Sequence, residues 1–124
     1  MIVVGDEVKD PMSAGNAVVS LESTYFSTLG LPSPANEEAL QRCLTVIRSA
    51  GAVPALTAVL DGVICAGVSE EAHERVLASA VKVAARDLST VGFRNLPDGE
   101  TTVSAIVVIA DAVGIEVFAT GGIG

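Results

Sequence analysis

An apolar run, an amphipathic segment and a second apolar run follow one another between residues 17 and 60, and this order restricts the possible folds most. Residues 17–21 have the length and composition of a buried strand. Asn36 can cap a helix that reaches Gly51, with its apolar residues at three- and four-residue spacing. Residues 53–60 are rich in strand formers. Strand, helix and strand in this order predict an α/β fold.

The remainder of the chain repeats this alternation. Asp61 and Gly62 are typical of a two-residue hairpin, which predicts that residues 63–67 return beside residues 53–60. Later segments are expected to form a helix capped by Ser69 over residues 69–80, an extended piece over 81–85, a helical turn over 87–91, a loop over 94–99, a helix capped by Thr101 or Thr102 up to Val113, and a strand over 115–119. We therefore expect a mostly parallel sheet flanked by helices.

Length and composition limit the number of domains and the class of partner. The 124 residues, half of them hydrophobic, suffice for one domain. We divide them into an N-terminal segment, 1–16, which mixes charges with Pro11 and Gly15, and an α/β domain, 17–124, which looks incomplete. Seven basic against fifteen acidic residues give a net charge of 7 − 15 = −8, which disfavours nucleic acid and anionic membranes as partners.

The sequence predicts a cytoplasmic protein. Residues 103–113 form the longest apolar run, but Asp111 interrupts it and it is shorter than the ~20 residues of a membrane span. We expect a buried helix there. The first twenty residues carry Asp6, Glu7 and Asp10 and do not resemble a secretory signal.

Cysteine and histidine are too sparse to predict a metal site. Cys43 and Cys65 lack the spacing of a zinc motif and are expected to be small buried residues. His73 lies among glutamates on an expected solvent face, and a single histidine gives no basis for a metal centre or a catalytic triad.

Glu22 is the first candidate for chemistry. It follows the apolar strand over residues 17–21, and a carboxyl group at the end of a buried strand can retain its proton, as a proton donor must. A capping or surface role is the alternative.

Two further groups of residues could bind an anionic ligand. Lys82 and Arg86 form a cationic spot in an acidic chain, although lysines are most often simply exposed. Thr101 and Thr102 open a helix, whose N-terminal amides favour anions, although a plain N-cap explains both threonines equally well.

Seven motifs together resemble one family. They are SLEST at 20–24, GLPSPAN at 30–36, GAVPA at 51–55, DG at 61–62, KVAARDL at 82–88, TTV at 101–103 and FATGGIG at 118–124. In order and spacing they are similar to the pseudouridine-5′-phosphate glycosidases, the family of indigoidine synthase A-like proteins. The resemblance covers most of this chain, from residue 18 onward, but only the N-terminal portion of a family member.

The resemblance implies a manganese-dependent lyase of nucleotide catabolism, a homotrimer that cleaves pseudouridine 5′-phosphate reversibly into uracil and ribose 5-phosphate. The family's proton donor maps onto Glu22, and its substrate-binding lysine and valine map onto Lys82 and Val103. Arg86 and Thr102, in the same motifs, are further candidates for substrate binding. A second lysine of the family holds the ring-opened ribose as a Schiff base.

Departures from the family pattern limit what the resemblance implies. The family's Ser-His-Gly is replaced by residues 27–30, which lack the histidine, and alanines replace a serine and an arginine at Ala84 and Ala85. The metal-binding aspartate and the Schiff-base lysine map beyond Gly124. We therefore expect these residues alone to be inactive and, with a sheet face uncovered after residue 119, to self-associate. The alternative is a non-catalytic, degenerate ligand-binding or assembly fragment of the same fold.

Overall fold

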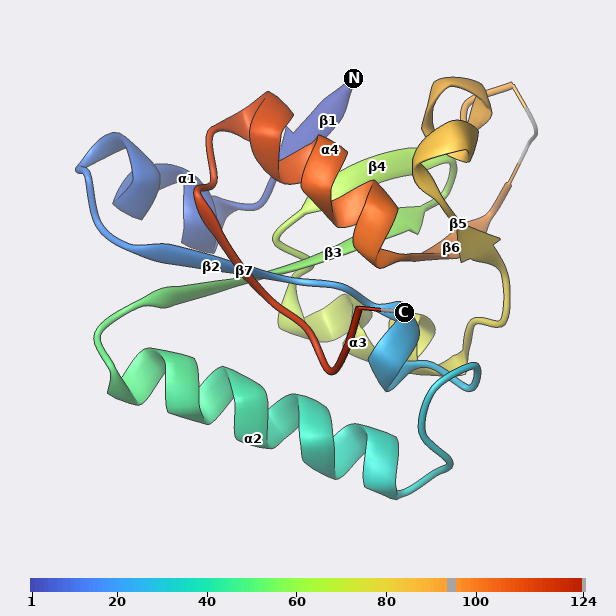
Figure 1. The fold of residues 1–124 in the computed structure, drawn as a ribbon, viewed down its shortest axis with the longest axis horizontal. Helices are drawn as coiled ribbons and strands as arrows, with labels where there is room; N and C mark the ends of the chain where they lie inside the picture. The colour runs from blue at the N-terminus through green and yellow to red at the C-terminus, as the bar shows by residue number, and fades with distance from the viewer. Residues whose placement is uncertain (94–95, 124) are drawn as a thin grey trace.

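Seven strands form one sheet between two layers of helices in the computed structural model, which describes residues 1–93 and 96–123 (Figure 1). In chain order the described elements are β1 (Ile2–Val4), α1 (Asp6–Ser13), β2 (Val18–Leu21), α2 (Ala35–Ser49), β3 (Val53–Leu60), β4 (Val63–Ala66), α3 (His73–Ala78), β5 (Lys82–Val83), β6 (Asp98–Thr101), α4 (Val103–Val113) and β7 (Val117–Ala119). Short 3₁₀ helices span Thr24–Phe26, Glu70–Ala72 and Ala85–Thr90.

The sheet is mostly parallel, as the alternation of strands and helices predicts. Its main path runs β1-β4-β3-β2-β7, while β6 pairs with both β3 and β5. The pairs β1–β4, β2–β3, β2–β7 and β5–β6 are parallel. Strand β3 is antiparallel to β4 and to β6. The predicted fold class, α/β with helices on both faces, is confirmed.

The predicted hairpin joins β3 to β4. Asp61 and Gly62 both adopt positive φ angles, 51° and 74°, which a two-residue type I′ turn requires. Leu60 consequently pairs with Val63, and the antiparallel register continues from there.

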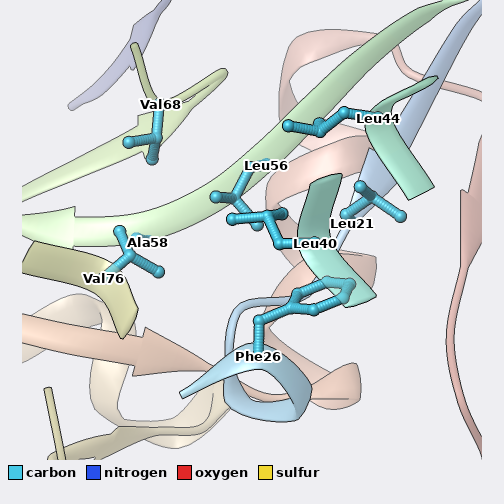
Figure 2. Packing of buried hydrophobic residues seen from close by; sticks show 8 residues of the cluster. All are labelled: Leu21, Phe26, Leu40, Leu44, Leu56, Ala58, Val68 and Val76. Carbon is cyan, nitrogen blue, oxygen red and sulfur yellow. The ribbon is translucent and has the colours of Figure 1, made fainter. Parts of the chain in front are cut away.

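One face of the sheet packs against α2 and α3. Leu40 and Leu44, one turn apart on α2, contact Leu56 of β3 and Leu21 of β2 in a fully apolar cluster (Figure 2). Phe26, just after β2, lies beneath Leu40 and closes the cluster at the carboxyl end of that strand. This packing fixes where β2 ends.

The other face packs against α1 and α4. Ile106 and Ile109 of α4 are fully buried, whereas Val107 and Val108 are 47% and 46% exposed. The expectation of a buried helix is therefore wrong for one side of α4, since α4 covers the sheet with a single face.

Two predicted helix caps are also wrong. Helix α2 begins at Ala35 after Pro34, so Asn36 is buried inside its first turn and does not cap it. Ser69 makes no side-chain cap, and the segment is divided into a 3₁₀ turn and a short α3 that ends at Ala78. In both places tertiary packing outweighs the local capping preference.

Two strands and a helix lie where none is predicted. Residues 1–16 contain β1, which extends the sheet beside β4, and α1, which buries Val8. The predicted loop over residues 94–99 is wrong at Asp98 and Gly99, which begin β6, while Arg94 and Asn95 fall outside the described residues. Asp and Gly are poor strand formers, so pairing with β3 and β5 forms this strand rather than propensity.

The edge of the sheet at β7 is exposed. Strand β7 pairs with β2 alone among the described strands, and Val117 is 56% exposed. The expected self-association stays a prediction. Among the described residues, no helix is both long enough and apolar enough to cross a membrane.

Candidate functional site

Two strands meet end to end at the candidate site. Both β2 and β6 pair with the same edge of β3, β2 through Leu56 and β6 beginning at Ala58, but they run in opposite directions. Their carboxyl ends therefore approach each other in the middle of the sheet (Figure 1). The residues that follow the two strands, Glu22 and Thr102, lie on either side of this junction.

Three buried side chains hold the junction together, and we call Ser23, Thr57 and Thr101 the hydroxyl cluster. Thr101 Oγ1 lies 3.1 Å from Ser23 Oγ and 2.8 Å from Thr57 Oγ1. The Thr101 amide donates to Ser23 Oγ at 2.8 Å, and Thr57 Oγ1 donates to the Leu21 carbonyl at 3.0 Å. Since all three residues are fully buried, these bonds fix the ends of β2 and β6 relative to each other.

Glu22 borders a cavity at the end of β2. Its side chain is 7% exposed, and Thr120, just after β7, donates a short hydrogen bond to Glu22 Oε1. The cavity measures about 190 Å³ and is lined by Leu21, Glu22, Tyr25, Phe26, Cys43, Ala119, Thr120 and Gly121. The parallel register of Leu21 with Ala119 brings Thr120 beside Glu22. The structure thus places the predicted proton donor where a small ligand can reach it.

A tight turn closes this cavity. Thr120 Oγ1 accepts a hydrogen bond from the Gly122 amide at 3.3 Å and lies 3.2 Å from the Gly122 carbonyl oxygen. A Cβ atom at Gly121 would lie only 2.5 Å from Cε2 of Tyr25. A side chain at position 121 would therefore have to displace the tyrosine ring, which rests on the backbone of the turn.

The two cysteines and the histidine differ from their expected burial. Cys43 and Cys65 are half-buried, less than expected, and burial raises the pKa of both thiols. His73 is buried and its Nε2 lies 3.3 Å from the Val68 carbonyl, so the expected solvent face is wrong there. Raised thiol pKa values make both cysteines weak nucleophiles at neutral pH.

The predicted cations lie on the other side of the junction. Lys82 is exposed on β5 in register with Glu100 of β6, and Arg86 is exposed in the 3₁₀ helix that follows. Neither forms an ion pair with a described residue. No hydrogen bond between described residues joins either of them to Glu22. Both positive charges are consequently available to a ligand.

Thr102 is the N-cap of α4, which decides between the two predicted caps. Its Oγ1 accepts from the Ala105 amide at 3.4 Å and lies 3.0 Å from Ser104 Oγ. Ser104 Oγ in turn accepts from the Ala85 amide at 3.0 Å. These contacts fix the start of α4, and with it Val103, beside the segment that carries Arg86.

Glu100 is a buried carboxyl group that sequence reasoning missed. It is 0% exposed, and neither carboxyl oxygen has a hydrogen-bond partner of good geometry among the described residues. Burial raises the pKa of Glu100 from 4.5 to about 8; the nearby Ser79 and Ser23 hydroxyls lower it, and the Asp98 charge raises it. Only a strand prediction over residues 98–101 could have placed this side chain inside.

The described residues do not form a metal site. No three His, Cys, Asp or Glu side chains among residues 1–93 and 96–123 are grouped so that they could hold an ion.

The fold and the site define an α/β protein with a ligand cavity at the carboxyl ends of parallel strands, where such folds bind small molecules. The profile of the indigoidine synthase A like protein family matches residues 7–124. The chain belongs to this family.

Individual relatives agree with this assignment. The chain is 42% identical to a pseudouridine-5′-phosphate glycosidase of Arabidopsis thaliana, over 100% of the chain and 38% of the relative. It is 50% identical to one of Rhodospirillum centenum, over 95% of the chain and 37% of the relative. The prealnumycin C-glycosynthase, solved with ribulose 5-phosphate, superimposes with a TM-score of 0.85 and 33% identity over 100% of this chain and 40% of its own. The chain thus spans about two-fifths of the length of these relatives.

Proposed function

We propose that this chain supplies the proton donor and part of the substrate site of a pseudouridine-5′-phosphate glycosidase, a lyase that cleaves pseudouridine 5′-phosphate reversibly into uracil and ribose 5-phosphate. The position of Glu22 carries the proposal, since it combines burial, a neighbouring hydroxyl donor and access to a cavity. The shared name of relatives 42% and 50% identical to the chain supports the choice of substrate.

The bond to be broken explains why an acid is needed. Pseudouridine joins its base to ribose through a carbon–carbon bond, so uracil can leave only after its C5 atom has accepted a proton. In our proposal the Glu22 carboxyl gives that proton to C5, the bond between C5 and C1′ of the ribose breaks, and one water supplies the oxygen with which C1′ leaves in ribose 5-phosphate. In the reverse direction water is released and the Glu22 carboxylate takes the proton back. The apolar side chains of Leu21 and Phe26, beside Glu22, keep water away from the proton in transit.

The other candidate residues serve the anionic end of the substrate. Lys82 and Arg86 supply positive charge in a chain whose net charge is −8. Thr102 caps α4, whose first amides and positive dipole end favour a phosphate, and Val103 lies on the same turn. We assign substrate binding to these four residues and proton transfer to Glu22.

The cofactor, the assembly and the cellular location remain parts of the proposal. By family resemblance the complete enzyme uses Mn²⁺, forms a homotrimer and acts in the cytoplasm on a small nucleoside phosphate. The contribution that we assign to this chain is proton transfer and substrate binding.

A segment transplant tests the proposal. This chain replaces the matching segment of the Rhodospirillum centenum relative, and uracil release from pseudouridine 5′-phosphate is measured in the chimera with Mn²⁺ present. Glu22→Gln keeps the size of the side chain and removes the acid, so turnover should fall by roughly 10²-fold or more with substrate binding retained. Glu71→Gln, at an exposed position, is the control and should retain turnover.

The outcomes separate the two candidate functions. Near-normal turnover in Glu22→Gln contradicts the role of Glu22. A folded chimera that releases no uracil even with Glu22 intact contradicts the enzyme proposal and favours the non-catalytic, degenerate fragment.

A further inference from the structure

Glu100 is a buried carboxyl group that has no role in the proposed chemistry. Its side chain is fully buried, and none of its neighbours pairs with the carboxyl group through a hydrogen bond of good geometry. Leaving a buried carboxyl group unpartnered costs stability. Glu100 pairs with Lys82 of β5 on one side and with Ala58 of β3 on the other, and its side chain is 0% exposed. Glu100 can therefore affect a ligand only through a neighbouring residue.

The neighbour that can transmit this effect is Lys82. Lys82 and Glu100 are partners in the parallel β5–β6 ladder, so their side chains leave the same face of the sheet, about 5 Å apart at their bases. The next pair, Val83 and Thr101, leaves the opposite face and is buried there. Lys82 is exposed and has no ion pair among the described residues. Its flexible side chain is thus free to extend toward a ligand or to fold back over β6.

The other titratable groups around Glu100 cannot replace Lys82. Asp98 lies two residues earlier on β6 and adds negative charge. Arg75 on α3 is engaged by Asp98 and by Asp61, the latter at 2.9 Å. His73 on α3 directs its Nε2 to the Val68 carbonyl. Of these charged groups on β5, β6 and α3, Lys82 is therefore the cation that has no ion pair among the described residues.

We propose that Glu100 is a positioning residue for Lys82: the protonated carboxyl leaves the ammonium group of Lys82 free for an anionic substrate, and the ionised carboxylate draws it back onto β6. The inference rests on the proposed function, which makes Lys82 a substrate-binding residue. It adds that substrate binding weakens in alkaline solution. A buried carboxylate is stable only when paired, so its ionisation recruits the nearest free cation. No covalent step is involved.

The contact itself is tested on this chain without any ligand. Lys9 and Lys82 are its two lysines, so reductive methylation with ¹³C-formaldehyde gives two lysine signals, besides that of the N-terminal amine, and the methylated lysines keep their charge. The Lys82 signal should shift with a midpoint near pH 8, the pKa to which burial raises Glu100, while Lys9 should not. In Glu100→Gln, an uncharged isostere, the Lys82 shift should disappear. An identical shift in both proteins overturns the inference.

Binding of ribose 5-phosphate then connects the contact to the ligand. Wild-type affinity should fall roughly fivefold between pH 7 and pH 9, whereas Glu100→Gln should change less than about twofold. Parallel profiles for the two proteins would overturn the positioning role. Lys82→Met tests the proposed function separately: unchanged binding at pH 7 contradicts the substrate role of Lys82, whatever its methyl signal reports about Glu100. Circular dichroism melts confirm that all variants are folded.

Discussion

Glu22, just after β2, and Glu100, within β6, are two buried carboxyl groups, and their surroundings differ although β2 and β6 share one edge of β3. Glu22 lies where β2 leaves the sheet, borders a cavity of about 190 Å³ and accepts a hydrogen bond from Thr120. Glu100 lies within β6, fully buried and without a partner of good geometry. The first can touch a ligand, whereas the second can act only through another side chain.

The hydroxyl cluster lies between these two regions. Ser23 follows Glu22 and Thr101 follows Glu100, and the two residues hydrogen-bond to each other at the junction. The polar atoms of the cluster are paired, as those of structural polar residues usually are. The unpaired carboxyl of Glu100 is the exception in this region, and exceptions of this kind are candidates for function.

The largest effect should appear in the pH dependence of stability. The pKa of a glutamate is ordinarily 4.5, and that of Glu100 is about 8 in the folded protein. Between these two pH values the folded chain therefore holds a proton on Glu100 that the unfolded chain has lost. The contribution of Glu100 to the free energy of unfolding is therefore fully present below pH 4.5. It falls as the pH rises to about 8, by at most ~1.4 kcal/mol per pH unit. Glu100→Gln should flatten this slope in urea unfolding measured from pH 5 to 9.

Glu71→Gln, at an exposed glutamate, controls for the removal of a charge and should keep the wild-type slope. A slope that persists in Glu100→Gln would mean that Glu100 ionises in the folded state as easily as in the unfolded chain, and the contrast with Glu22 would lose its basis.

The second effect concerns the cluster that joins the two regions. Thr101→Val keeps the shape of the side chain but removes Oγ1, which leaves Ser23 and Thr57 short of a buried partner. We expect a loss of about 2–3 kcal/mol in the free energy of unfolding. A loss below about 0.5 kcal/mol in chemical denaturation would show that the junction does not depend on these bonds.

A smaller effect is expected at the Glu22 side. Thr120→Val removes the hydroxyl that donates to Glu22 Oε1 and leaves the β7 pairing in place. Uracil release by the chimera should fall by roughly threefold to tenfold, because one net hydrogen bond orients the acid. Unchanged kcat would show that Glu22 is oriented by other contacts.

The smallest effect is expected at Ser20. Its side chain is fully buried on β2, but its hydroxyl lies 3.4 Å from the Ala55 carbonyl, which makes a weak bond. Ser20→Ala should cost less than about 1 kcal/mol in thermal unfolding. A cost as large as that of Thr101→Val would remove the distinction between the cluster and other buried hydroxyls.

Most of the fold could be predicted from periodicity and turn chemistry. The helix spacing of Leu40 and Leu44, the Asp61–Gly62 turn and the apolar run of β2 are local signals, and each element formed where it was expected. Strands β1 and β6 could not be predicted because they are short, and β6 contains residues that disfavour strands. Their formation depends on pairing with distant segments.

The same limit applies to the site. Glu22, Lys82 and Thr102 could be singled out from motifs, because each stands at the end or the start of an element that the sequence reveals. Glu100 and the partnership of Ser23 with Thr57 could not, since they arise only when β6 pairs with β3. The roles of Glu22, Lys82, Arg86, Thr102 and Val103 in binding or catalysis stay predictions.

The protonation state of Glu100 is the most direct test of the contrast between the two carboxyl groups. It can be followed in this chain through the ¹³C resonance of the Glu100 side-chain carboxyl, assigned by its absence in Glu100→Gln. We predict a titration midpoint at a pKa near 8, so that most of the carboxyl is uncharged at pH 7. A midpoint near the ordinary value of 4.5 would contradict this prediction, because Glu100 would then be charged at pH 7.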